Sequence, residues 1–312
     1  MSRERAMVPE PEFRSYYGQP IIKGPLWHEP HMPAYLYLGG LSGASSLLAA
    51  GCELTGRDRL AAPAKIAAAA AGTAGAAFLV AELGRPERFL NMLRVFKTTS
   101  PMSVGSWILA AQSGLAAVAA GSALTGLLPS IGKAAGLATG ITGPMMATYT
   151  AVLVADTAVP SWHTGHRELP FLFAGSALAS AGAVAMVAAP HREAGPARRM
   201  AMVGAAMETV AGEVLERRLG LLAEPYREGS AGRLMRAARV LTVTGGALAA
   251  VSGLTRWRTP SVLSAAALTA GSLCVRFGVL RAGRASAADP KYTVVPQRER
   301  IDARERNRAH GR

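Results

Sequence analysis

Residues 82–107 read ELGRPERFLNMLRVFKTTSPMSVGSW. This stretch combines Glu82 with three Arg, a Lys and two Pro, and it separates two long runs of apolar residues. It is too polar to lie in the hydrocarbon of a bilayer, where each charged side chain is costly. The flanking runs, at 65–83 and 104–124, are long enough to cross one, since a membrane-spanning helix needs about 20 apolar residues. We therefore interpret 82–107 as a connector at the polar end of a helical membrane bundle.

The same alternation of apolar runs and polar connectors continues along the chain. Of the 312 residues, 50% are hydrophobic and 17% are charged, whereas soluble proteins carry about 25% charged residues. The predicted spans lie at 34–52, 65–83, 104–124, 134–159, 169–189, 198–218, 237–254 and 261–280. The span at 198–218 contains three Glu, so an amphipathic helix in the plane of the interface is the alternative there. The predicted fold class is an all-α integral membrane protein with about eight transmembrane helices.

Composition divides the chain into a polar arm at 1–33, a transmembrane helical domain at 34–280 and a charged tail at 281–312. The six Pro of the arm exclude a continuous helix. The tail is too highly charged to bury a core of its own. The arm also lacks the apolar core of a cleavable signal peptide, so the first apolar run is expected to act as the first membrane helix.

Eight spans place both termini on one side of the membrane. Lys and Arg are more frequent on that side, mainly because of the arm and the tail. The positive-inside rule therefore predicts cytoplasmic termini in a multi-pass protein of the plasma membrane. The net charge of +14 is then explained by cytoplasmic loops beside anionic lipid, and no nucleic-acid partner is expected.

The positions of the His and Cys residues limit which redox cofactors the chain could hold. All six His fall in predicted loops or tails, and the two Cys are isolated. A membrane haem needs axial His ligands from the helices, and an iron–sulfur cluster needs a set of Cys. The sequence therefore predicts no haem and no metal site. If the chain takes part in redox chemistry, another subunit supplies the electrons.

Two carboxylates are candidates for proton transfer. Glu82 ends the second predicted span, and Asp156 lies near the end of the fourth, on the side of the termini. Ionisable residues at membrane depth usually mark a pathway or a buried pair. Tyr149 precedes Asp156 by seven residues, so both fall on one face of the helix. The structural alternative is an ion pair, of Glu82 with Arg85 or of Asp156 with Arg167.

The side of the termini also holds most of the His and Trp residues. These are His28, His31, His163, His166, Trp27, Trp107 and Trp162. One interpretation is a quinone site, in which His or Tyr donates hydrogen bonds to the carbonyls and a carboxylate takes up a proton. The alternative is an aromatic belt at the membrane interface, which Trp27, Tyr35 and Tyr37 around the start of the first helix would also suit.

Four stretches resemble the NrfD-like family, the membrane subunits of polysulfide reductases. They are LGRPERFLNMLRVFKTTSPMSVGSWIL (83–109), YLGGLSGAS (37–45), GPMMATYTAVLVADTAVPSWHTGHRELPFLFAGSALASAGA (143–183) and ADPKYTVVPQRER (288–300). The resemblance runs over nearly the whole chain. Within the family, the chain is similar to forms associated with formate dehydrogenase-like complexes.

The resemblance implies a quinone-reactive subunit of eight helices, arranged as two four-helix bundles without a haem. Its implied partners are an iron–sulfur subunit and a molybdopterin catalytic subunit. The family's quinone pocket uses a His near the start of the first helix, which matches His28 or His31, and a Tyr on the fourth, which matches Tyr149. The arm has no Asn where the family pocket has one, and Trp27 or Glu29 are the candidates to replace it. Menaquinone is the expected carrier.

The leading prediction is a membrane anchor that passes electrons between an iron–sulfur subunit and menaquinone, in the electron transport of anaerobic respiration. Asp156 or Glu82 is expected to relay protons. Five residues at the same end are expected to contact the quinone. They are His28, His31, Tyr149, Trp27 and Arg85. The chain is not expected to be an enzyme on its own. The alternatives are a purely structural anchor and a transporter, which polar residues crowded at one end of the spans disfavour.

Overall fold

A computed structural model describes residues 21–255 and 257–310 of the protein. In this described part every regular element is a helix. The eight long helices of its body are α1 (His31–Leu54), α2 (Asp58–Glu82), α3 (Pro101–Thr125), α4 (Pro129–Ala155), α6 (Leu169–Ala188), α7 (Gly195–Arg218), α9 (Gly229–Ser252) and α10 (Thr259–Ala288). The remaining helices are η1 (Pro86–Leu93), α5 (Pro160–Thr164), η2 (Gly220–Ala223), α8 (Glu224–Arg227) and α11 (Lys291–His310). The predicted all-α fold is confirmed.

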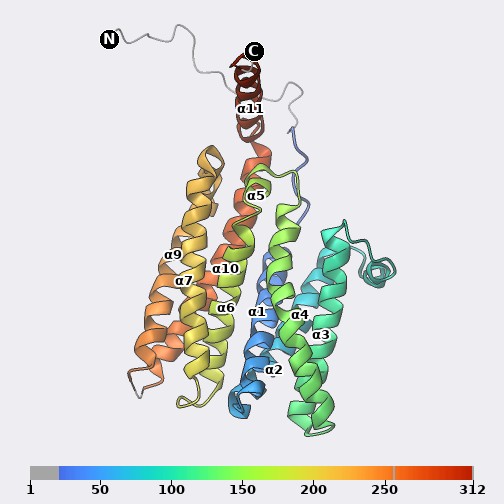
Figure 1. The fold of residues 1–312 in the computed structure, drawn as a ribbon, viewed down its shortest axis with the longest axis vertical. Helices are drawn as coiled ribbons and strands as arrows, with labels where there is room; N and C mark the ends of the chain where they lie inside the picture. The colour runs from blue at the N-terminus through green and yellow to red at the C-terminus, as the bar shows by residue number, and fades with distance from the viewer. Residues whose placement is uncertain (1–20, 256, 311–312) are drawn as a thin grey trace.

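Each predicted span falls on one of the eight long helices. By length and composition, six helices of the described part are apolar enough to cross a membrane, namely α2, α3, α4, α6, α9 and α10. Many Gly and Ser residues lower the hydropathy of α1, and charged residues lower that of α7. Both nevertheless run alongside apolar neighbours (Figure 1). The 198–218 segment therefore packs within the bundle instead of lying across its end.

The long helices form two groups of four (Figure 1). We call α1 to α4 the first bundle, and α6, α7, α9 and α10 the second bundle. The two bundles meet mainly where α1 and α4 pack against α6. The arrangement agrees with the two four-helix bundles that the family resemblance implies.

Small residues set the distance between neighbouring helices. At the crossing of α1 and α4, a Cβ on Gly43 would lie 2.2 Å from the carbonyl oxygen of Gly143. A Cβ on Gly143 would in turn lie 2.4 Å from the carbonyl oxygen of Gly43. Membrane helices depend on such close approach, because apolar side chains gain little by leaving apolar lipid. The glycines of the YLGGLSGAS stretch thus bring α1 against α4.

Two ionisable side chains lie deep inside the second bundle. Glu208 of α7 accepts a hydrogen bond from the Thr242 hydroxyl of α9 (2.6 Å). Arg276 of α10 is fully buried and donates to the carbonyl oxygen of Phe173 (3.0 Å), with its guanidinium 3.7 Å from the centre of the Phe173 ring. These contacts join α7 to α9 and α10 to α6, and they offset part of the cost of placing charge at this depth.

Among the helix boundaries that differ from the sequence-based expectation, three have a clear local cause. α4 ends at Ala155, before the expected end at 159, because the Thr157 hydroxyl donates to the carbonyl of Val154 (2.9 Å) and Asp156 leaves the helical conformation. Pro160 does not simply end a helix but begins α5, where its missing N–H costs nothing. α10 continues past Leu280 to Ala288, because the Arg-Ala-rich segment favours a helix and packs against the arm.

Tyr35 and Tyr37 belong to the protein core. Tyr35 is fully buried and Tyr37 nearly so. Trp162 is fully buried as well. The interpretation as a belt of interfacial aromatic residues is therefore wrong for these three side chains. α1 lies in the middle of the molecule, and α5 packs against α10.

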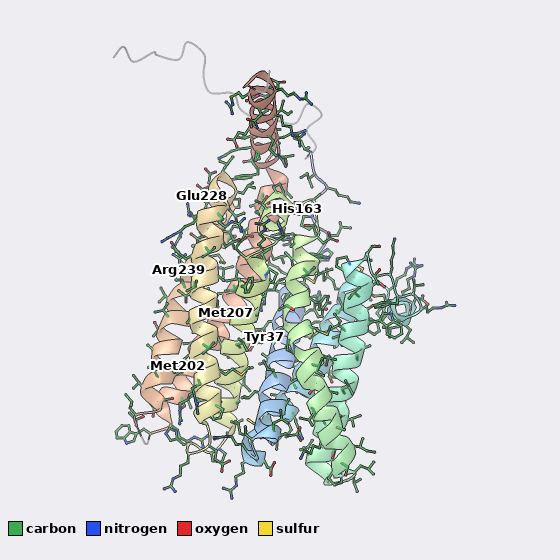
Figure 2. The ribbon with its side chains drawn as sticks, viewed as in Figure 1. Tyr37, His163, Met202, Met207, Glu228 and Arg239 are labelled. Atoms are coloured by element: carbon green, nitrogen blue, oxygen red, sulfur yellow. The ribbon has the colours of Figure 1, made fainter. Side chains whose placement is uncertain are left out.

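The connectors separate into two ends of the molecule. α11, the arm at 21–30, η1 and α5 lie at one end, which we call the α11 end (Figure 1). His163 and Glu228 also lie toward this end, whereas Met202 lies toward the opposite end (Figure 2). The connectors expected on the side of the termini thus lie together in space.

Candidate functional site

The arm brings residues of both bundles together at the α11 end. Residues 21–30 run along the seam between the bundles. The backbone N–H groups of Met32 and Ala34, in the first turn of α1, donate hydrogen bonds to the carbonyl oxygens of His28 and Pro30, each at 3.0 Å. The last residue of α2, Glu82, lies beside this turn. The site is therefore built where two helix ends and an extended segment converge.

Glu82 lies beneath two imidazoles. Its Oε1 accepts a hydrogen bond from the backbone N–H of His28 (2.7 Å) and lies 3.2 Å from His28 Nδ1. His31 Nδ1 lies 3.6 Å from Glu82 Oε2. The Glu82 side chain is only 9% exposed, whereas those of His28 and His31 are 72% and 39% exposed. The structure brings both histidines to Glu82, and the carboxylate pairs with them instead of with Arg85.

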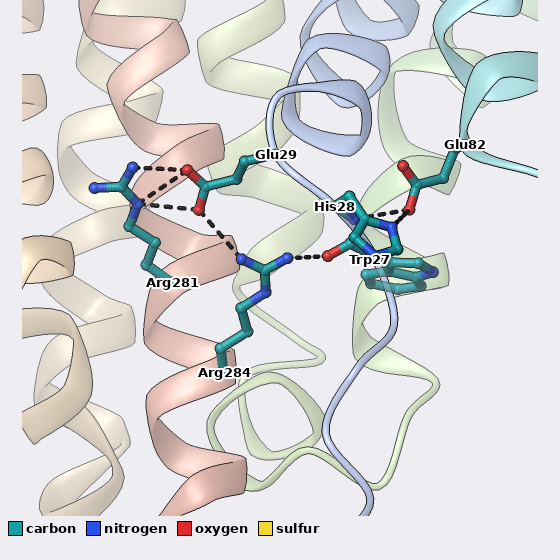
Figure 3. A network of polar contacts seen from close by, with 6 residues as sticks. All are labelled: Trp27, His28, Glu29, Glu82, Arg281 and Arg284. Atoms are coloured by element: carbon teal, nitrogen blue, oxygen red, sulfur yellow. Dashed lines mark hydrogen bonds and ion pairs between the residues drawn. The ribbon is translucent and has the colours of Figure 1, made fainter. Parts of the chain in front are cut away.

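A second set of contacts ties the same arm residues to α10 (Figure 3). Arg281 donates to both carboxylate oxygens of Glu29, at 2.6 and 3.0 Å. Arg284 reaches Glu29 at 3.4 Å and also donates to the carbonyl oxygen of Trp27. The hydrogen bonds from Arg281 hold the pKa of Glu29 below its ordinary value. Glu29 is thus engaged with α10 and does not line the cavity described next, so it is not placed to replace the family's Asn.

Trp27 is held in place by a tryptophan stack. Its ring lies 5.4 Å from that of Trp162, with an angle of 22° between the planes. The buried indole N–H of Trp162 donates to the carbonyl oxygen of Val279 (2.7 Å). Gly283 makes room for this ring, since a Cβ there would lie 1.8 Å from it. The aromatic pair therefore fixes the arm to α5, and the hydrogen bond of Trp162 fixes α5 to α10.

A cavity of about 250 Å³ opens between Trp27, Glu82 and Tyr149. Its lining comes from the arm, α1, α2, η1, α3 and α4. The lining residues are Leu26, Trp27, Met32, Leu79, Glu82, Leu83, Met92, Met102, Ser106, Tyr149 and Leu153. Apolar side chains dominate, with one carboxylate, one phenol and one hydroxyl among them. Such a mixture is typical of pockets that bind a small, largely apolar ligand in a fixed orientation.

Tyr149 forms the wall between this cavity and the outside of the first bundle. Its hydroxyl shares a hydrogen bond with that of the buried Tyr35. Its ring lies against α3 where Gly105 has no side chain, since a Cβ there would be 1.9 Å from the ring. Tyr149 also lines a groove of about 480 Å³ between α3 and α4, and Asp156 lies in that groove.

The connector between α2 and α3 is held by hydrogen bonds to the first turns of α3. The Ser103 hydroxyl donates to the carbonyl of Val95 (2.9 Å) and accepts from the N–H of Lys97 (3.0 Å). The Ser106 hydroxyl lies 3.3 Å from the carbonyl oxygen of Met92. These contacts explain the serines of the Ser-Pro-Met-Ser-Val-Gly-Ser string, because they hold η1 where Met92 reaches the cavity.

The structure separates the predicted site residues into two groups. It brings together five of them, namely Trp27, His28, His31, Glu82 and Tyr149. Asp156 follows the last residue of α4, is exposed, and lies on the outer groove beyond Tyr149. Arg85 is exposed in the connector and does not line the cavity. Roles for these two residues remain predictions.

Sequence reasoning missed Tyr35, Ser106 and the methionines of the cavity. Tyr35 lies one helical turn after Met32, so a common inward face was visible in the spacing. Nothing local indicated that this face meets α4. In the described part of the chain, no three His, Cys, Asp or Glu side chains converge as metal ligands. The donors present suit a neutral ligand that carries carbonyl groups.

The chain matches a known protein-family model. The family model described as polysulphide reductase, NrfD, matches residues 21–223. This range begins with the arm, ends with η2, and contains every residue that lines the cavity. No curated protein matches the chain.

Proposed function

The chain belongs to the NrfD family, and from this premise we propose that it is the quinone-reactive membrane subunit of an oxidoreductase complex. It exchanges electrons between an iron–sulfur partner subunit and menaquinone. The observation that carries the proposal is the cavity at the α11 end, where Glu82 under two histidines faces a pocket that Tyr149 closes.

The chemistry of the cavity suits a quinone ring. Reduction of a quinone adds two electrons and two protons, one proton at each carbonyl oxygen. The Tyr149 hydroxyl is a hydrogen-bond donor for one carbonyl. Glu82 Oε2 is buried without a hydrogen-bond partner, so it is available to pass a proton to the other or to take one up. Apolar walls exclude water, which strengthens both interactions.

The two histidines connect Glu82 to water. Their side chains are more exposed than the carboxylate they contact. An imidazole ring can both accept and donate a proton, so either histidine can carry a proton from solvent to Glu82 after each transfer. His28 or His31 thus supplies the path, and Glu82 supplies the group that faces the quinone.

The outer groove is the proposed approach for the quinone tail. Tyr149 lines both this groove and the cavity. Residues from α3 and α4, the exposed Met145 and Val152 among them, line the groove. A long isoprenoid chain lies there in contact with lipid while the ring occupies the cavity. Asp156 at the end of α4 then attracts protons to the mouth of the groove.

The partner subunit is proposed to dock at the α11 end, because electron transfer to the cavity requires a short distance. The connector presents four exposed cations there, Arg85, Arg88, Arg94 and Lys97. They bind acidic groups of the partner or lipid headgroups. A molybdopterin catalytic subunit, of the formate dehydrogenase-like kind, is the proposed source or acceptor of the electrons beyond the cluster.

Photolabelling with a light-activated menaquinone analogue tests the proposal. We expect labelled peptides from the arm, the end of α2, η1 and α4, with labelling lost when unlabelled menaquinone competes. Leu79→Trp fills the cavity and is expected to lower labelling at least tenfold. Leu124→Trp, at an exposed position far from the cavity, is the matched control. Absence of competed labelling in the wild-type complex would instead make the chain a purely structural anchor.

A further inference from the structure

Another large depression lies at the end of the molecule opposite α11. It is an open groove of about 510 Å³ at the seam between the two bundles. α1 and α7 supply most of its lining. Leu178 of α6 contributes as well, and so do Thr55 and Arg57 of the turn between α1 and α2. α6 packs extensively against both α1 and α7, whereas α1 and α7 barely touch each other. The groove is therefore the gap that two helices from different bundles leave over a third.

The groove is long, narrow and apolar. On α1 its lining residues recur at helical spacing from Leu47 to Thr55, which corresponds to about 12 Å along the axis. On α7 they recur from Pro196 to Val203. Gly51 deepens it, since a Cβ added there meets nothing within 4 Å. An extended hydrocarbon chain is the ligand that such a shape accommodates best.

Two arginines stand at the polar end of the groove. Arg57 precedes α2 and Arg199 lies in the second turn of α7, and both are exposed groove residues. Asp58 is adjacent to Arg57 in the sequence, at the first position of α2, but it forms no ion pair with Arg57 within the described residues. Two further acidic groups close in the sequence are engaged elsewhere. Glu53 pairs with Lys65 at 2.5 Å, and Glu193 lies 3.5 Å from Arg59.

Neither Arg57 nor Arg199 has an ion pair or a side-chain hydrogen bond within the described residues. Two unpaired guanidinium groups above an apolar groove offer a binding site for an anion with an apolar extension. A guanidinium matches a phosphate oxygen pair in geometry as well as in charge.

We propose that this groove binds one anionic phospholipid of the surrounding bilayer. One acyl chain lies along α1 and α7, and the phosphate lies between Arg57 and Arg199. Basic pockets between membrane helices are suited to acidic lipid headgroups. Leu47 and Val203 are exposed on the walls, so the groove is open to the lipid side. The bound lipid then joins α1 of the first bundle to α7 of the second, which have little direct contact.

Native mass spectrometry of the full chain tests this assignment. The protein is purified, stripped of lipid, and titrated with dioleoyl phosphatidylglycerol or dioleoyl phosphatidylcholine. We expect one phosphatidylglycerol to bind at lower concentration than phosphatidylcholine. The double variant Arg57→Gln/Arg199→Gln should weaken phosphatidylglycerol binding roughly tenfold or more, since each cation near the lipid surface contributes on that scale. Lys133→Gln removes an exposed charge at the same end outside the groove and should change nothing.

A groove-filling variant tests the acyl chain separately. Gly51→Leu occupies the depression at an exposed position in a helix, where Leu favours the fold. It should lower the binding of both lipids. Equal binding of the two lipids to the wild type would overturn the proposal. So would phosphatidylglycerol binding that survives either the double variant or Gly51→Leu, or complete competition by an equal concentration of glycerol 3-phosphate, which has no chain.

Discussion

At the scale of single residues, Glu82 illustrates how a carboxylate can be kept near membrane depth. The peptide N–H of His28 and two imidazoles surround it, while Oε2 stays free of hydrogen bonds. If both oxygens accepted hydrogen bonds, the carboxylate would have only a structural role. If neither oxygen had a partner, burying the carboxylate would cost too much free energy. The intermediate state observed here leaves one oxygen available to a ligand.

The substitution Glu82→Gln preserves the shape of this side chain and removes its proton-transfer capacity. Quinone-coupled turnover of the assembled complex should fall about 100-fold, because general acid–base groups contribute at least that much. The KM for quinone should change little. Glu87→Gln, an exposed neighbour in the connector, is the control. Unchanged turnover in Glu82→Gln would remove Glu82 from the mechanism.

Gly105→Ala places a methyl group where the Tyr149 ring lies. The ring must move and lose its hydrogen bond to Tyr35, so stability should drop by about 1–3 kcal/mol, as expected for overpacking, and quinone binding should weaken. The matched control is Gly114→Ala on the same helix, where the added Cβ meets nothing within 4 Å. Melting temperature and binding of a menaquinone analogue are the measurements. Equal melting curves for the two variants would contradict the packing described for Tyr149.

At the scale of elements, the arm joins the two bundles. His28 contacts Glu82 of α2 in the first bundle, and Glu29 contacts Arg281 and Arg284 of α10 in the second. Consecutive residues of one extended segment therefore hold helices that are far apart in the chain. The cavity depends on this link, since Trp27 of the same segment is one of its walls.

The arm's attachment should weaken in acid. Because the pKa of Glu29 is lower in the folded protein than in the unfolded chain, its stabilisation is present above the ordinary Glu pKa of about 4.3 and is lost as pH falls through the lower folded value. Hydrogen exchange in 21–30, corrected for the intrinsic pH dependence, should increase over that range. In Glu29→Gln the arm should exchange faster already at neutral pH and respond less to acid. Identical profiles for the two proteins would show that Glu29 does not hold the arm.

At the scale of the whole molecule, the chain is a multi-pass membrane protein of two bundles with different roles. The first bundle and the arm form the cavity. The second bundle holds the buried Glu208 and Arg276 and supplies the Arg284 contact to the arm, while Trp162 of α5 stacks on Trp27 of the arm. The family match covers the first bundle together with α6 and α7 of the second bundle.

Cysteine labelling should establish the orientation. In a background that lacks Cys52 and Cys274, a Cys replacing Glu228 at the α11 end should react with a membrane-impermeant reagent only from the cytoplasmic side. A Cys replacing Lys133 or Leu254 at the opposite end should react only from the other side. The reverse pattern would place the termini outside the cytoplasm. Labelling of all three from one side would contradict the bundle topology.

The sequence by itself determined where the long helices lie. Each helix follows from an apolar run of about 20 residues, and polar connectors and Pro mark where one run ends and the next begins. It also indicated the end of the molecule at which the site lies. The family motifs pointed to Tyr149 and to the two histidines. These inferences depend on local composition, which a single sequence records directly.

Only the tertiary structure decided which side chains share the site. The contacts of His28 with Glu82, Tyr35 with Tyr149 and Glu29 with Arg281 join residues 54, 114 and 252 positions apart. A membrane helix is apolar on all sides, so its sequence does not mark the face that turns inward. That choice is made by the close fit of small residues such as Gly43 and Gly105 against other helices. For the same reason the sequence placed Glu82 and Asp156 together, whereas the packing of Tyr149 puts them on opposite sides of one wall.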